Sequence, residues 1–159
     1  MNKVPHLKYQ MRQNQWEIKD RSKMEQFLDQ AEVGRLGLYD GEEPYIVPFN
    51  FAYKNNRIYM HSALKGRKLE IIKKFPRVCF ECDEFIEYDS VKQFTSYRSV
   101  FCFGNIRILD SNDTPEYIEA LEAINQKYEP GAEMSCKSGA LVLILDIETM
   151  TGREKLTKQ

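Results

Sequence analysis

The sequence predicts a mainly β domain in which six antiparallel strands, with three helices inserted, curl into a small barrel. Segments in which apolar and polar residues alternate outnumber segments with the three-and-four spacing of a helix. Neighbouring strands are joined by short turns, which favours antiparallel pairing over a parallel sheet. The length of 159 residues is sufficient for one core and short for two. We therefore expect a polar arm at residues 1–20 and one domain at residues 21–159.

Charge and hydropathy narrow the classes of partner. The formal net charge is -1, whereas a general nucleic-acid binder needs a broad cationic face. No apolar run approaches the roughly 20 residues of a membrane helix, and Met1–Gln15 lacks the apolar core of a signal peptide. We therefore expect a cytoplasmic protein that binds neither nucleic acid nor membrane.

The four cysteines do not have the spacing of a metal site or of an evident disulfide framework. Cys79 and Cys82 fall within one predicted strand, where residues three apart point to opposite faces. Cys102 and Cys136 form no second close pair, and no histidine is near. We expect reduced thiols and no metal.

The first elements are predicted to be a helix and a hairpin. Ser22 has the character of an N-cap, with Glu25 completing a capping box, and a helix is expected from Ser22 to Glu32. Its apolar stripe consists of Met24, Phe27, Leu28 and Ala31. The turn signal Asp40-Gly41 then separates a short strand, Gly34–Tyr39, from a long one, Pro44–Tyr53.

Pro48 interrupts the hydrogen-bonding capacity of this long strand. Proline has no backbone N–H to donate to a ladder, so the strand is expected to be interrupted or to lie at an edge there. Backbone groups beside such a break are free to contact a ligand.

The next segment has the features of a phosphate site. After a turn at Lys54–Arg57, a strand at Arg57–Ser62 runs into a short helix, Leu64–Phe75, which Pro76 ends. A helix start offers unpaired N–H groups and the positive end of the dipole to an anion. Lys65, Arg67 and Lys68 add charge beside it, although a solvated helix face would have the same composition.

The remaining elements complete the barrel. Gly104 indicates a bulge or a close approach within the fifth strand. Thr114-Pro115 begins a helix whose buried stripe is Tyr117, Leu121, Ile124 and Tyr128. The other predicted elements are a fourth strand at Arg77–Phe85, a polar linker, a fifth strand at Ser99–Leu109, a central strand at Ala140–Ile147 and a basic tail at Arg153–Lys158.

Four motifs in this order resemble a known family. They are Arg35-Leu36-Gly37-Leu38, then Pro44 to Phe51, then His61-Ser62-Ala63 with Gly66-Arg67-Lys68, then Tyr97-Arg98-Ser99-Val100 with Gly104. The chain resembles the flavin-binding split-barrel proteins, and more narrowly the branch related to pyridoxamine-phosphate oxidase that includes nitroimidazole-resistance proteins. The resemblance covers about Met11 to Glu154.

This resemblance implies a homodimer of six-stranded antiparallel split β-barrels with FMN, or sometimes FAD, in the groove between subunits. The implied cofactor-binding residues are Pro48, Phe49, Asn50, His61, Ser62, Ala63, Gly66, Arg67, Lys68, Arg98, Ser99 and Val100. Among these, Ser62, Arg67 and Lys68 would contact the phosphate, and the segment from Pro48 to Asn50 would run along the flavin ring. His61 is the one candidate catalytic residue, with the cap of a strand end as its alternative role.

The resemblance further implies a flavin-dependent oxidoreductase similar to nitroimidazole reductases. Such an enzyme would pass electrons from a reduced nicotinamide to a small electron-poor acceptor. The alternative is a protein that binds, stores or senses flavin without steady turnover. Haem binding is not favoured, because neither His6 nor His61 lies in an evident axial-ligand setting. The tail at 151–155 lacks the arginine and histidine pattern for vitamin B6 oxidation, and no residue recognises a nitro group.

Overall fold

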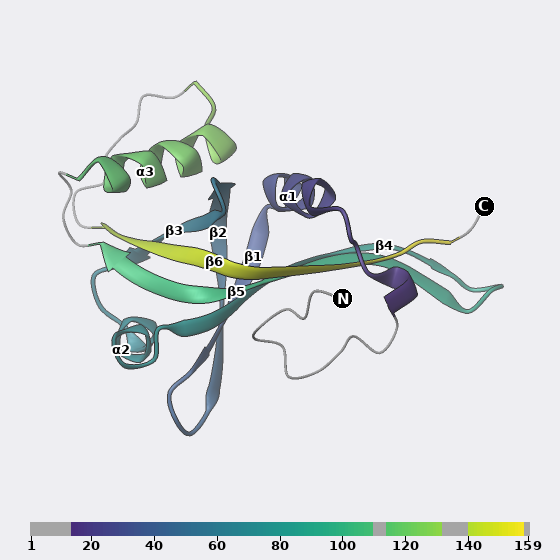
Figure 1. The fold of residues 1–159 in the computed structure, drawn as a ribbon, viewed down its shortest axis with the longest axis horizontal. Coiled ribbons are helices and arrows are strands. Elements are labelled where there is room, and N and C mark those ends of the chain that lie inside the picture. The colour runs from purple at the N-terminus through teal and green to yellow at the C-terminus, as the bar shows by residue number, and fades with distance from the viewer. Residues whose placement is uncertain (1–13, 110–113, 132–139, 158–159) are drawn as a thin grey trace.

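The computed structural model describes residues 14–109, 114–131 and 140–157. Six antiparallel strands form a closed barrel in the order β1-β2-β3-β6-β5-β4, which confirms the predicted fold class (Figure 1). The strands are β1 Val33–Tyr39, β2 Pro44–Lys54, β3 Arg57–Ala63, β4 Arg77–Asp89, β5 Phe94–Leu109 and β6 Ala140–Lys155. The helices are the short 3-10 turn η1 Asn14–Trp16 and the α-helices α1 Arg21–Gln30, α2 Arg67–Lys74 and α3 Pro115–Tyr128.

Strand β2 changes its partner half-way along. Its first part, Pro44–Asn50, pairs with β1, whereas Phe51–Lys54 pairs with β3. Within the described residues, the side of Pro44–Asn50 that faces away from β1 therefore pairs with no strand. Pro48 lies in this half, so the strand is continuous and edge-like there rather than interrupted.

The turn that follows β2 fixes which backbone groups face the open side. Asn55 and Asn56 both have positive φ angles, 51° and 63°, as a two-residue type I′ hairpin requires. Lys54 and Arg57 are then the hydrogen-bonded closing pair, so every second residue back from Lys54 directs its N–H and C=O to the β3 side. Counting back, Asn50 and Pro48 direct their backbone groups to the open edge.

Two apolar clusters hold the barrel. The larger fills the interior and includes Leu36, Phe51, Met60, Phe80 and Val100. The smaller lies between the outer wall and α3 and consists of Tyr59, Tyr117, Ala120, Val142 and Ile144. Because residues 141–145 of β6 are buried on both faces, the prediction of a central last strand is confirmed.

The start of α1 differs from the prediction. Asp20, not Ser22, is the N-cap, and its carboxylate accepts a hydrogen bond of 2.9 Å from the Ser22 N–H. Ser22 therefore lies inside the first turn, where its hydroxyl no longer has the capping geometry. Glu25 does not complete a capping box, since its side chain accepts from Arg21 and from the Tyr53 hydroxyl, each at 2.8 Å.

The expected polar linker, and Arg153–Lys155 of the expected basic tail, are instead parts of long strands. Strands β4 and β5 continue to a turn at residues 90–93, where the Asp89 carboxylate accepts from the Val91 and Lys92 N–H groups. β6 extends to Lys155, which pairs with Tyr97. These extensions of β4, β5 and β6 project together from the barrel and form an arm that is distinct in sequence from the N-terminal segment at residues 1–20 (Figure 1). Since much of the arm is exposed, it lacks the apolar alternation that reveals a half-buried strand.

Gly104 combines both features that its position predicted. The register between β5 and β6 shifts at Phe103/Gly104, and a Cβ on Gly104 would overlap the Asp146 carbonyl oxygen. The opposing atom belongs to the backbone of a central strand, so it has little freedom to move.

Replacing this glycine should therefore be costly. We expect Gly104→Ala to lower the free energy of unfolding by about 2 to 3 kcal/mol, because β6 must be displaced to admit the methyl group. Urea unfolding measures this. Gly37→Ala is the matched control, since its Cβ would approach the Cys79 carbonyl oxygen only to 3.3 Å. Equal losses for the two variants would contradict the assignment of the close approach to Gly104.

Candidate functional site

The start of α2 is the one helix start, among the three described α-helices, without a side-chain cap. Asp20 caps α1 and Thr114 caps α3, whereas Gly66 at the N-cap of α2 makes no such bond. Gly66 has a φ of 145°, and a Cβ built there would meet no atom within 4 Å. The Leu69 N–H donates to the Gly66 carbonyl at 3.0 Å, so the N–H groups of Arg67 and Lys68 are the ones that this helix start can offer to an anion.

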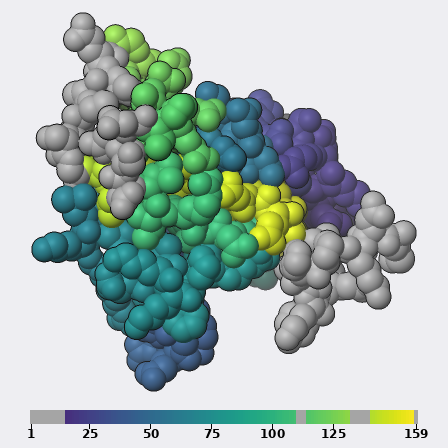
Figure 2. Space-filling view, turned by 60° about the vertical axis from the view of Figure 1, so that its left-hand side comes forward, coloured from purple at the N-terminus to yellow at the C-terminus, as the bar shows by residue number. Residues whose placement is uncertain are grey.

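Arg67 is held against the β1–β2 hairpin. Its guanidinium lies 3.0 Å from the Asp40 carboxylate and 3.5 Å from that of Glu43. It also stacks 4.8 Å from the centre of the Tyr45 ring. Figure 2 shows the tip of this hairpin, in slate blue, directly below the teal region that contains α2. Asp40, Glu43 and Tyr45 were not among the predicted site residues, although the Asp40-Gly41 turn signal indicated the loop that carries two of them.

Asp40 is itself fixed by the turn. Its carboxylate accepts hydrogen bonds from the Glu43 and Glu42 N–H groups, at 2.7 and 2.9 Å. These two bonds, followed by the Arg67 guanidinium, lower the pKa of Asp40 to about 2. Asp40 is therefore ionised at neutral pH and keeps one side of the Arg67 side chain occupied.

Lys68 is the less engaged of the two cations. Its ammonium lies 5.8 Å from the centre of the Phe49 ring, and it makes no ion pair with any residue in the described ranges. Because Phe49 lies on the open half of β2, this contact joins the helix start to that edge. Lys65 precedes the helix and is exposed.

The end of β3 lies beside the helix start in the chain and contributes residues on both faces. Ser62 is only 4% exposed and donates a 3.1 Å hydrogen bond to the carbonyl of Ala63. His61 and Ala63 are exposed, as alternation along the strand requires. The hydroxyl oxygen of Ser62 retains its capacity to accept a further hydrogen bond.

The open half of β2 forms the next wall. Phe49 turns into the barrel interior and is buried, whereas Pro48 and Asn50 are exposed on the opposite face. Their side chains are accordingly separated by the strand, while the backbone groups of Pro48 and Asn50 face the open edge. A planar ligand along this edge would meet main-chain donors and acceptors rather than side chains.

Arg98, Ser99 and Val100 form a separate group on β5. Going round the barrel from β2, one passes β1 and β4 before reaching β5, a separation of about 14 Å at 4.8 Å per strand. Val100 is buried in the core, and Ser99 is also buried. Arg98 contacts Glu154 at 2.8 Å and stacks 5.4 Å from the Phe27 ring. One chain therefore does not bring these three residues to the open half of β2.

Thiols and metal ligands have no part in this arrangement. Cys79, Cys82 and Cys102 are free, and burial raises the pKa of Cys79 to about 11 and that of Cys82 to about 12. Cys136 lies outside the described residues. Within them, no cluster of three metal-ligating side chains exists, and no helix is long and apolar enough to cross a membrane.

Comparison with known proteins identifies the family. Residues 20–154 match the sequence profile of pyridoxamine 5'-phosphate oxidase. The chain belongs to this family. Membership of the pyridoxamine 5'-phosphate oxidase family agrees with the barrel fold. It also confirms the resemblance that was inferred from the four sequence motifs.

Solved structures similar to this family member carry descriptions that concern flavins and nitroimidazoles. A candidate 5-nitroimidazole antibiotic resistance protein from Bacteroides thetaiotaomicron superposes with a TM-score of 0.78 at 26% identity, covering 87% of this chain and 86% of its own. An FAD-binding protein from Mesorhizobium loti gives 0.64 at 26% identity, covering 86% and 96%. The flavocytochrome Anf3 from Azotobacter vinelandii gives 0.77 at 17% identity, covering 94% and 73%, and shows the fold alone.

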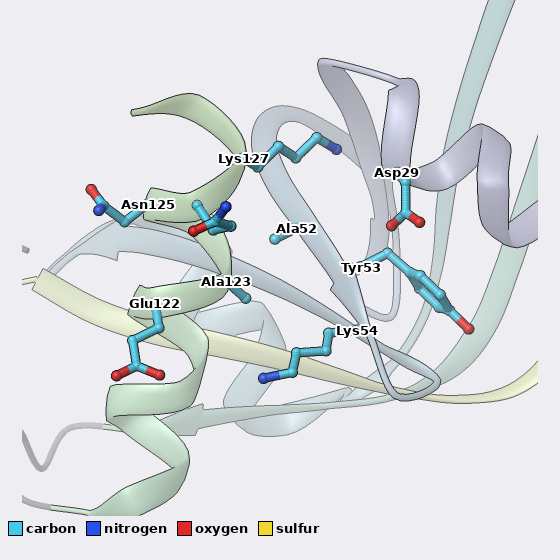
Figure 3. Close-up of a pocket in the computed structure, with 9 residues that line it drawn as sticks. Asp29, Ala52, Tyr53, Lys54, Glu122, Ala123, Asn125 and Lys127 are labelled. Carbon is cyan, nitrogen blue, oxygen red and sulfur yellow. The ribbon is translucent and has the colours of Figure 1, made fainter. Parts of the chain in front are cut away.

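A cavity of about 520 Å³ lies elsewhere on this family member, between α1, α3 and the second half of β2 (Figure 3). Asp29 of α1, Lys54 of β2, and Glu122 and Lys127 of α3 are among its lining residues. None of the predicted site residues lines it. The cavity is therefore distinct from the arrangement around the start of α2.

The Asp40 carboxylate gives a test of the hairpin contact. The pKa of this group is lowered in the fold, so its stabilising contribution is present above its ordinary value of 3.8 and is lost as the pH falls towards about 2. We expect Arg67→Ala to raise the pKa of Asp40 only part of the way, because the two backbone N–H groups are the larger cause. Carboxyl-carbon NMR titration of both proteins measures this. A full return to 3.8 would mean that Arg67 alone holds the carboxylate.

Proposed function

We propose that this chain is a flavin-dependent oxidoreductase that binds FMN, or FAD, between the start of α2 and the open edge of β2. The observation that carries the proposal is the uncapped start of α2 beside that edge, with two cations within reach of both. The FAD-binding relative at 26% identity supports the choice of a flavin. A cytoplasmic location, where reduced nicotinamides are available, belongs to the same proposal.

The phosphate of the flavin is assigned to the helix start. The N–H groups of Arg67 and Lys68 would donate to the phosphate oxygens, and the Lys68 ammonium would add an unshared positive charge. Arg67 would donate from the side of the guanidinium not engaged by Asp40 and Glu43. The Ser62 hydroxyl and the unobstructed space at Gly66 suit the same role.

The flavin ring is assigned to the open edge of β2. The N–H of Asn50 and the carbonyls of Pro48 and Asn50 face that edge, where they can hydrogen-bond to the polar rim of the ring and orient it. A bound flavin would supply the electron transfer, from a reduced nicotinamide to a small, flat, electron-poor acceptor. His61 and Ala63 are exposed at the end of the neighbouring strand, and we assign His61 to contact with the ring or the acceptor.

A homodimer is part of this proposal because, within one chain, the predicted flavin contacts on β5 lie apart from those on β2. The β5 segment Arg98–Val100 of the partner subunit would meet the flavin through Ser99, which lies on the same face of β5 as the exposed Phe101, whereas Val100 points into the core. This face belongs to the wall of the barrel formed by β1, β2, β4 and β5. Apolar side chains are exposed on that wall, with Ile46 at 65% and Phe101 at 38%. Such residues favour burial against a second copy.

The substrate is limited by what the chain lacks. Residues 151–155 continue β6 and do not supply the arginine and histidine pattern expected for pyridoxamine phosphate, so we do not propose vitamin B6 oxidation. Reduction of nitroimidazoles is suggested by the Bacteroides relative alone. It therefore enters as a choice of acceptor to be tested.

The proposed function predicts a yellow protein. Purified protein should show flavin absorption, and NADH or NADPH should bleach it without oxygen, with recovery when an acceptor such as a nitroimidazole is added. Mass spectrometry of the released chromophore distinguishes FMN from FAD. A protein that binds flavin but accelerates no nicotinamide oxidation would be a storage or sensing protein. A colourless protein that flavin titration leaves unchanged would refute the proposal.

Loss of the cations should weaken the binding of FMN but not of riboflavin. We expect Lys68→Ala to weaken FMN binding by about 1 to 3 kcal/mol, and Arg67→Ala by less, since Arg67 is shared with Asp40 and Glu43. Isothermal titration with both flavins separates the phosphate from the ring. Lys74→Ala removes the same charge from the other end of α2 and should have little effect. Equal weakening of FMN and riboflavin would place the phosphate elsewhere.

The dimer has its own test. Sedimentation should show the mass of two chains, and Ile46→Lys should shift it towards one chain and weaken flavin binding together, because a monomer would lack the contacts that β5 of the partner subunit is proposed to supply. Ile118→Lys on α3 is the control, since Ile118 is 38% exposed but lies away from this wall. A monomeric wild-type protein with full flavin affinity would exclude the shared site.

A further inference from the structure

The last turn of α3 is tied to the point at which β2 changes its partner. The Tyr128 hydroxyl accepts a 2.9 Å hydrogen bond from the Phe51 N–H. The hydroxyl lies 2.6 Å from the Glu32 carbonyl oxygen and 3.0 Å from that of Phe51, and its single proton suits the shorter contact. Glu32 precedes β1, whose first residue, Val33, pairs with Asn50. Tyr128 therefore supplies the next rung of the β1–β2 ladder, where β1 has ended.

Lys127, the residue before Tyr128, contacts the same part of the chain. Its ammonium donates to the Leu28 carbonyl at 3.0 Å and lies 4.0 Å from the centre of the Phe51 ring. Burial of this ammonium lowers the pKa of Lys127 to about 8, although Asp29 partly opposes the shift. Lys127 and Tyr128, named here the α3 clamp, thus join α1, the entry to β1, and Phe51.

The α3 clamp acts on the residue immediately after the open edge of β2. Phe51 has its backbone fixed by Tyr128, its ring against Lys127, and its ring edge-to-face with Phe80 at 4.8 Å. Asn50, one residue earlier, directs its N–H and C=O to the open edge and has no β3 partner. The direction of the Asn50 backbone is consequently set on one side by its pairing with β1 and on the other side by Phe51.

We propose that Tyr128 and Lys127 are positioning residues, which hold the Asn50 backbone in the direction that a flavin ring at the open edge requires. The inference rests on the proposed function and adds to it a part of the chain that contacts no ligand. The clamp is remote from the phosphate end, so it acts on the ring alone. Its effect should be the same for a flavin with a phosphate and for one without.

Tyr128→Phe removes only the hydroxyl and tests the clamp. We expect the dissociation constants of FMN and riboflavin to rise by the same factor, about two- to tenfold. The visible absorption band and the midpoint potential of the bound flavin should shift as well, since hydrogen bonds at the ring set both. Lys127→Met keeps the apolar stem, removes the ammonium, and should change the two affinities in the same direction.

Tyr53→Phe is the matched control. It is the same substitution on β2 itself, and its hydroxyl donates to the Glu25 side chain at 2.8 Å without contacting the backbone near Asn50. It should lower the melting temperature without changing the flavin affinity, the spectrum or the potential. A wild-type protein that binds no flavin overturns the proposed function and the clamp together.

Normal flavin binding by wild type leaves two results that overturn the clamp alone. One is unchanged affinity, spectrum and potential in Tyr128→Phe. The other is an equal change in Tyr53→Phe, which would indicate a general loss of stability. Should Tyr128→Phe fail to fold, unchanged binding by Lys127→Met overturns the clamp as well.

Discussion

The partner change of β2 at Asn50 and Phe51 is the constraint on which the rest of the structure depends. A closed six-stranded barrel would pair every backbone group of an interior strand, and such groups could not contact a ligand. Here the strand leaves one side of Pro44–Asn50 unpaired while the barrel still closes through Phe51–Lys54. Proline at 48 suits this exposure because it has no N–H to leave unsatisfied. The candidate ring site is thus a consequence of the register.

The helix end of the candidate site depends on the absence of a side-chain cap at the start of α2. A side-chain cap at position 66 would occupy a first-turn N–H group, as Asp20 does with the Ser22 N–H in α1 and Thr114 does with the Tyr117 N–H in α3. Glycine leaves the N–H groups of Arg67 and Lys68 available, and Arg67 is oriented by Asp40, whose carboxylate is already fixed by backbone N–H groups of the β1–β2 turn. An anion at the proposed phosphate site would meet donors whose positions are set before it binds, which would reduce the ordering cost of binding.

The sequence predicts those parts of the fold and site that follow from local pattern. Alternation and turn residues located the strands of the closed barrel, and the Gly66–Lys68 segment was found from residue types at a helix start. The arm of β4, β5 and β6 was missed because exposed strands carry no apolar alternation. The contacts of Arg67 with Asp40, and of Tyr128 with Phe51, join residues 27 and 77 positions apart. No local pattern encodes such pairs.

Tyr128 belongs to the buried stripe of α3 and has two roles, packing and hydrogen bonding. Its spacing from Tyr117 and Ile124 marks it as a buried position, and burial alone would be satisfied by phenylalanine. The hydroxyl adds something that packing does not need, a donor and an acceptor placed where β1 ends and β2 still has a free N–H. A barrel that leaves one edge of β2 open for a ligand must still hold the other edge, where the β1–β2 ladder ends. Without a partner there, the backbone of Phe51 would not be fixed, and neither would that of Asn50. A side chain from outside the sheet can do this without adding a strand, so the edge of β2 at Asn50 remains open while Phe51 is fixed.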